Sequence, residues 1–186
     1  MAMMLDESEA SDAELIGRAK GGDRCAFGKL LERHYNFVYR AAYRWCGNKA
    51  NAEDIAQDVC VRLGRAIRDY HGSGAFTTWL YAMTLNAARD MMRKTARETV
   101  KTHAYGVHAL ISGEALAEPE DPAEALWIAV RNLPDKQRDA VLLVYGEGLS
   151  HAAAAEAMAI SETTVSWHIH EAKKRLKVLV REGLQS

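Results

Sequence analysis

The sequence is poor in the residues that mark several classes of protein. Its three cysteines, at positions 25, 46 and 60, form no C-x-x-C pair, which argues against a disulfide framework or a sequence-local zinc site. Its three prolines and scarce strand-like alternation favour helices over sheets. It has no apolar run long enough to span a bilayer, and its N-terminus is acidic where a signal peptide is basic. We therefore expect a cytoplasmic protein with reduced thiols and no membrane insertion.

Signals of catalysis and of metal binding are also scarce. The histidines are scattered, and His168 and His170 would point about 200 degrees apart on a helix, because each residue turns the chain by about 100 degrees. No nucleophile-base pair, glycine-rich phosphate loop or paired acid motif stands out. We therefore expect no metal, no cofactor and no enzymatic activity. The net charge of −1 means that any nucleic-acid site must be local.

Helical periodicity organises the first half of the chain into one four-helix bundle. The expected helices cover about 11–20, 23–46, 51–69 and 76–94. Their expected N-caps include Ser11, which would form a capping box with Glu14, then Asp23, and finally Asn51 together with Asp54. The turn at 70–75, YHGSGA, separates the last two helices.

The second half predicts a linker followed by a smaller helical domain. Residues 96–122 contain glycines and two prolines, end in acidic residues and show no sustained period. Four shorter helices are expected after them, the last capped by Ser161. A short helix, a tight turn and a longer helix with basic residues form a helix-turn-helix candidate. The predicted fold is therefore all-α, with two small domains at 11–95 and 123–184 joined by a linker at 96–122.

The stretch NAEDIAQDVCVRL carries two helical stripes on one expected helix. Ile55, Val59 and Leu63 recur every four residues and predict a buried face. Asp54, Gln57 and Asp58 lie on adjacent turns of another face. Taken alone, this second stripe is best interpreted as a solvated surface, and the alternative is a docking surface for a basic partner helix.

The expected helix from Phe76 combines three kinds of side chain that suit single-stranded or melting DNA. Aromatic residues crowd its N-terminal half, one amide lies in the middle, and cations collect towards its end. These residues are Phe76, Trp79, Tyr81, Asn86, Arg89, Arg93 and Lys94. The alternative is that Phe76 and Trp79 are core residues, and for Trp79 this alternative is favoured.

Five motifs resemble, in order and spacing, the two domains of the extracytoplasmic-function sigma factors of bacterial RNA polymerase. The motifs are GDRCAFGKLLERHYNFVYRAA, AEDIAQDV, FTTWLYAMTLN, LPDKQRDAVLLVYGEGLS and ISETTVSWHIHEAKKRL. Together they span the chain from about Asp12 to Leu179, excluding the linker.

The resemblance implies a function for each motif. Asp54, Gln57 and Asp58 would face the clamp helices of the polymerase beta-prime subunit, the turn would hold a flipped base of the minus-ten promoter element, and Asn86 would assist strand opening. The expected minus-ten residues are Tyr70, His71, Ser73, Phe76, Trp79, Asn86, Arg89, Arg93 and Lys94. Further implied partners are the beta flap of core polymerase, promoter DNA and an anti-sigma factor. With the flexible linker, the anti-sigma factor would clamp the domains together in an inhibited form.

The C-terminal helix-turn-helix would read the minus-thirty-five element, although its sequence departs from the family pattern. Ala159 and Thr163 stand where many members have glycine, and the early recognition helix is not basic. By helical spacing, the expected contacts to bases come from Glu162, Thr163, Ser166, Trp167 and His170. Lys173 and Lys174 are placed for phosphates.

Two alternatives to an initiation subunit remain open from the sequence alone. The first is a stand-alone helix-turn-helix transcription regulator whose N-terminal bundle senses a signal or dimerises. The second is a metal-dependent or thiol-dependent enzyme on a helical scaffold. The acidic stripe followed by the aromatic and amide helix favours the initiation subunit, because a regulator that never melts DNA does not need that pair.

Overall fold

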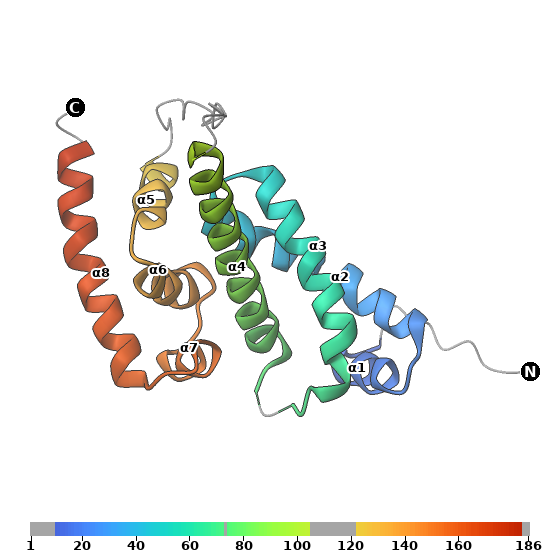
Figure 1. Cartoon of the computed structure of the whole chain (residues 1–186). Coiled ribbons are helices and arrows are strands. Elements are labelled where there is room, and N and C mark those ends of the chain that lie inside the picture. The colour runs from blue at the N-terminus through green and yellow to red at the C-terminus, as the bar shows by residue number, and fades with distance from the viewer. Residues whose placement is uncertain (1–9, 73, 105–121, 184–186) are drawn as a thin grey trace, which may run out of the picture.

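The protein is an assembly of helices in two groups (Figure 1). The structure, a computed structural model, describes residues 10–72, 74–104 and 122–183, and no strand occurs in these ranges. The first group contains α1 (Asp12–Lys20), α2 (Arg24–Cys46), α3 (Lys49–Ala66), the 3-10 turn η1 (Ile67–Asp69) and α4 (Phe76–Ala104). The second contains α5 (Pro122–Arg131), α6 (Asp135–Val141), the π-helical turn η2 (Leu142–Gly146), α7 (His151–Met158) and α8 (Glu162–Gly183). The predicted all-α class is confirmed.

The helix starts follow the capping chemistry of the sequence, with one correction. Ser11 and Glu14 form the predicted capping box, and Asp23 accepts two backbone N–H bonds at the start of α2. The predicted cap at Asn51 is wrong. Gly47 ends α2 in the left-handed region, at φ 72°, and leaves Asn48 extended, so the Asn48 side chain caps α3 and accepts from the N–H of Asn51.

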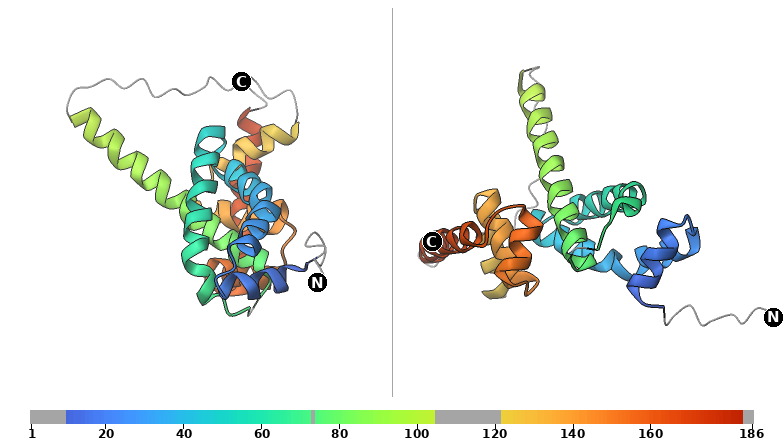
Figure 2. Two further views of the ribbon diagram at one scale, coloured as in Figure 1. Left: turned by 90° about the vertical axis from the view of Figure 1, so that its right-hand side faces the viewer. Right: turned by 90° about the horizontal axis from the view of Figure 1, so that it is seen from below.

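The fourth helix is longer than the predicted 76–94. It continues to Ala104, so residues 96–104 of the predicted linker are helical. The buried stripe fades after Met91, but the following sequence, TARETVKTHA, contains no glycine or proline to stop a helix. Figure 2 shows this end of α4 extending beyond the other helices.

The two helical groups share one continuous core. In the first group α2 packs against α1, α3 and α4, and in the second α8 packs against α5, α6 and α7. Contacts between α4 and α7 and between α2 and α5 join the groups. The largest fully buried side chains, which come from both groups, include Trp45, Tyr81, Leu30, Leu133 and Leu142. The chain therefore adopts a closed arrangement in which one domain lies on the other.

The turn before α8 uses an alanine in a conformation that favours glycine. Ala159 ends α7 at φ 52° and ψ 46°, and it is the one residue other than glycine with positive φ among those described. Its N–H bonds back to Ala155 and Glu156, as a left-handed C-cap requires. The left-handed conformation costs an L-residue with a Cβ about 1 kcal/mol. The sequence therefore keeps a small amount of backbone strain in its helix-turn-helix.

We predict that Ala159→Gly raises the free energy of unfolding by about 0.5–1 kcal/mol, because glycine removes this strain and loses part of the gain to the entropy of the unfolded chain. Urea denaturation followed by circular dichroism measures the change. The matched control is Ala152→Gly on the exposed side of α7, which should lower the free energy by about 0.5–1 kcal/mol. Destabilisation by both variants would show that Ala159 is not strained.

Candidate functional site

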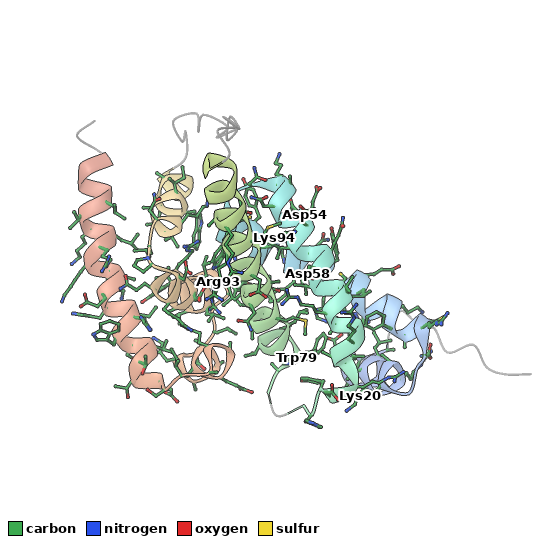
Figure 3. The ribbon with its side chains drawn as sticks, in the orientation of Figure 1. Lys20, Asp54, Asp58, Trp79, Arg93 and Lys94 are labelled. Carbon is green, nitrogen blue, oxygen red and sulfur yellow. The ribbon has the colours of Figure 1, made fainter. Side chains whose placement is uncertain are left out.

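The polar stripe of α3 is a solvent-exposed ridge. Asp54, Gln57 and Asp58, here called the acidic ridge, are all exposed, while the Ile55 and Val59 side chains between them are buried. Figure 3 shows Asp54 and Asp58 on α3, which is separated from the C-terminal helices by α4. Arg62 pairs with Asp58 at 2.8 Å and with Asp90 of α4 at 3.0 Å, which fixes one end of the ridge against the next helix.

The loop between η1 and α4 is built around three aromatic rings in edge-to-face and tilted contacts. The Tyr70 ring centre lies 4.9 Å from that of Trp79 and 5.5 Å from that of Phe76. Phe76 is buried and Trp79 is half-buried. Phe76 is therefore a core residue, and part of Trp79 also packs against the core. The Tyr70 hydroxyl donates to the Gly74 carbonyl at 2.8 Å. The cluster therefore fixes the loop and leaves only part of each ring free.

Two hollows flank this loop. One, of about 240 Å³, lies between Tyr70, His71 and Trp79 on one side and Glu156 of α7 on the other. The other, of about 590 Å³, opens between the loop and α1. Lys20 lines the second hollow and donates to the Tyr70 carbonyl at 2.7 Å, a contact for which the sequence gives no signal. The predicted residue Ser73 lies outside the described residues.

The polar residues of α4 follow the loop along one helix. Asn86 is exposed and its Oδ1 atom accepts from Arg89 at 2.8 Å. Arg93 and Lys94 are exposed further along, and Figure 3 shows them about midway along α4, beyond Trp79. The structure thus places the loop, the amide and the cations along one helix, as predicted, but Arg89 is not free.

Arg89 contacts a buried carboxylate of the C-terminal helices. Its guanidinium pairs with Asp139 of α6, whose side chain is 0% exposed. Asp139 also accepts from the Trp45 indole N–H of α2 at 2.9 Å. Burial raises the pKa of the Asp139 carboxyl above its ordinary value, and Arg89 opposes that rise. A carboxylate of one domain thus joins two helices of the other.

The C-terminal helices α7 and α8 form the predicted helix-turn-helix. Ser161 caps α8 by accepting from the N–H of Thr164 at 3.1 Å, which confirms that prediction. All of the predicted minus-thirty-five residues are exposed, namely Glu162, Thr163, Ser166, Trp167, His170, Lys173 and Lys174. The Ser166 hydroxyl bonds with His151 at 2.9 Å, and the Lys173 ammonium lies 5.2 Å from the centre of the Tyr145 ring. The face expected to meet duplex DNA is therefore accessible in the closed arrangement.

In the described part of the chain, no group of three or more His, Cys, Asp or Glu side chains is arranged to hold a metal ion. No helix there has the length and apolar character that crossing a bilayer requires.

A helical bundle followed by a helix-turn-helix domain is the architecture of a two-region DNA-binding transcription factor, and the comparisons specify the family. The model of sigma-70 region 2 matches residues 30–98, and that of sigma-70 region 4 matches residues 123–176. The chain is 31% identical over 172 residues to the ECF RNA polymerase sigma factor SigM of Mycobacterium tuberculosis, covering 92% of this chain and 86% of SigM. It is 29% identical over 179 residues to SigW of Bacillus subtilis, covering 90% and 95% respectively. The chain belongs to the ECF RNA polymerase sigma factors.

Solved structures agree on the fold. CnrH, solved in complex with the cytosolic domain of CnrY, matches with a TM-score of 0.65 and 24% identity, covering 92% of this chain and 97% of CnrH. RpoE of Bartonella quintana, solved with the anti-sigma factor NepR, matches with a TM-score of 0.67 and 21% identity, covering 83% and 96%. A member of this family is an alternative initiation factor and not an enzyme, so the stand-alone regulator and the enzyme are both set aside.

Proposed function

We propose that this sigma factor docks on core RNA polymerase in the bacterial cytoplasm through the acidic ridge and opens promoters with the loop and helix α4. In this assignment, residues 11–95 form region 2 and residues 123–184 form region 4, separated by a linker whose first part continues α4. The observation that carries the proposal is the separation of the two surfaces on one small bundle. The ridge is exposed on α3, and the aromatic loop, amide and cations follow α4.

The acidic ridge supports docking because its side chains have the geometry of a recognition surface. Two carboxylates and one amide lie on adjacent turns, above a buried apolar stripe that fixes the helix. Complementary charge gives orientation and a fast encounter with a basic partner helix, and the amide adds a directional hydrogen bond. The proposed partner surface is the clamp helices of the beta-prime subunit, with the beta flap meeting region 4.

The loop and α4 support strand opening because they combine stacking, hydrogen bonding and charge. Extruding one base from a duplex costs a few kcal/mol, which the receiving pocket must offset. Tyr70, His71 and Trp79 line a hollow beside the loop, and Asn86 presents an exposed amide two helical turns beyond Trp79. Arg93 and Lys94 are placed to hold phosphates further along. The minus-ten assignment therefore uses the face of α4 that is not packed on α2 and α3.

Region 4 supports recognition of the minus-thirty-five element through the exposed N-terminal half of α8. Glu162 can accept from cytosine, and Trp167, 56% exposed, can pack on thymine methyl groups. Lys173 and Lys174 are exposed further along α8, where they can bind phosphates. We further propose that an anti-sigma factor holds this chain inactive, since similar folds were solved in complex with such partners.

The ridge assignment predicts that Asp54→Lys and Asp58→Lys together abolish binding to purified core polymerase, because the change inverts the charge of the surface without touching the core. Co-purification or fluorescence anisotropy measures binding, and circular dichroism should show unchanged helicity. The control is Glu32→Lys, an exposed residue of α2. Retained binding by the double variant would remove the docking assignment.

The amide assignment predicts that Asn86→Ala lowers open-complex formation on duplex promoters at least several-fold more than on pre-melted promoters, because a pre-melted template does not need its bases extruded. Permanganate footprinting and run-off transcription with core polymerase measure this ratio. The control is Asn132→Ala, which removes an exposed amide from the end of α5. An equal loss on both templates would mean that Asn86 has only a structural role.

A further inference from the structure

The closed arrangement covers part of the proposed strand-opening surface. Arg89, predicted to meet the minus-ten DNA, is only 12% exposed because Asp139 of α6 lies against it. At the loop, Glu156 and Ala157 of α7 form one side of the hollow lined by Tyr70 and Trp79. The C-terminal domain thus occupies two parts of the region that DNA would have to reach.

The covering contact at the loop is made by the Glu156 side chain of α7. A Cβ atom placed on Gly74 would lie 2.5 Å from a carboxylate oxygen of Glu156, closer than real contacts allow. Glycine at position 74 therefore leaves room for the Glu156 side chain over the loop, and a larger residue would displace that side chain. Glu156 is exposed overall, so its position over Gly74 is a surface contact and not part of the apolar core.

The side chains of region 4 that cover this surface are negatively charged, as DNA is. Asp139 pairs with Arg89, and Glu156 lies over the loop. A third carboxylate, Glu147 of the segment after η2, accepts from Arg44 of α2 at 2.5 Å and joins the two regions outside the strand-opening surface. DNA presents phosphates to cations such as Arg89. A carboxylate placed on such a cation competes with a phosphate for the same hydrogen bonds.

We propose that the free chain inhibits itself: region 4 closes on region 2, and Asp139 and Glu156 mask the strand-opening surface until the two regions separate. This inference rests on the proposed function of α4 and adds its regulation, without any second protein. The acidic ridge and the early residues of α8 remain exposed in the closed form. Figure 1 shows α8 at the opposite side of the molecule from α3. Docking on polymerase is thus compatible with the closed form, whereas binding of the minus-ten strand is not.

The interface is polar enough to open. The Tyr81 hydroxyl is buried without a hydrogen-bond partner among the described residues, and so is Oε1 of Gln137 on α6. Burial raises the pKa of both Asp139 and Glu147, which shows that these carboxylates lose hydration on closure. Opening would return water to Asp139 and Glu147, so the closed form keeps only a small part of the favourable energy of its contacts.

The test compares the full-length wild type with the double variant Asp139→Asn and Glu156→Ala, which changes the two masking carboxylates. Small-angle X-ray scattering should fit the closed arrangement for the wild type and show an expanded particle for the variant. The affinity for short fluorescent single-stranded oligonucleotides of random sequence should rise about tenfold, because apparent affinity follows the fraction of open chains. Circular dichroism checks that the helices of both proteins are intact.

The matched control removes two exposed carboxylates of region 2 outside the interface, through Glu32→Ala and Glu53→Gln. An equal gain in affinity by this control would overturn the proposal, because loss of negative charge alone would explain it. A third protein adds Asn86→Ala to the open variant and should lose most of the gain.

The remaining outcomes separate the masking from the proposed function. An expanded wild type, or a double variant that neither expands nor gains affinity while still supporting transcription, would overturn the self-inhibition alone. Expansion without a gain in affinity would contradict both the masking and the assignment of the DNA surface to α4.

Discussion

The pairing of Asp139 with Arg89 and Trp45 is the interaction on which the arrangement of the two domains depends. A fully buried carboxylate is costly to desolvate, and it is tolerated here because a guanidinium and an indole N–H from the other domain point at it. Removing one partner of such a buried pair costs about 3–5 kcal/mol, far more than an exposed pair contributes. Opening the two domains would therefore hydrate Asp139, and closing them replaces that water with Arg89 and Trp45.

A second cation reinforces this contact without entering it. The Arg138 guanidinium lies 4.1 Å from the centre of the Trp45 ring and bonds to Asp135 at 2.8 Å. Arg138 therefore packs on the Trp45 indole, which donates to Asp139, the next residue in the sequence. Close by, Gly47 leaves room for the Arg131 side chain, since a Cβ there would lie 2.7 Å from that side chain. The end of α2 is thus shaped to receive the C-terminal helices.

Most of the fold could be predicted from helix caps and helical periodicity. The contacts between residues far apart in the sequence could not. Ser11, Asp23 and Ser161 act as caps through side chains that bond within three residues, so their signal lies in the sequence. Asn48 was missed because two asparagines lie close together, and only the turn at Gly47 decides between them. The exposure of the acidic ridge followed from periodicity. The contacts of Lys20, Asp139 and Glu156 join residues far apart in the chain, and no periodic pattern marks them.

The division between exposed and covered surfaces gives an order to initiation. A chain that exposes its acidic ridge while its strand-opening loop is covered cannot bind the minus-ten strand before it docks on polymerase. Polymerase would stabilise the open form only if it binds that form better than the closed one, because a ligand shifts an equilibrium by its differential affinity alone. The near-zero net charge suits this order, since strong nonspecific attraction to DNA would favour opening without polymerase. The carboxylates of region 4 thus explain how a protein with cations on α4 stays weakly attracted to DNA while it is free.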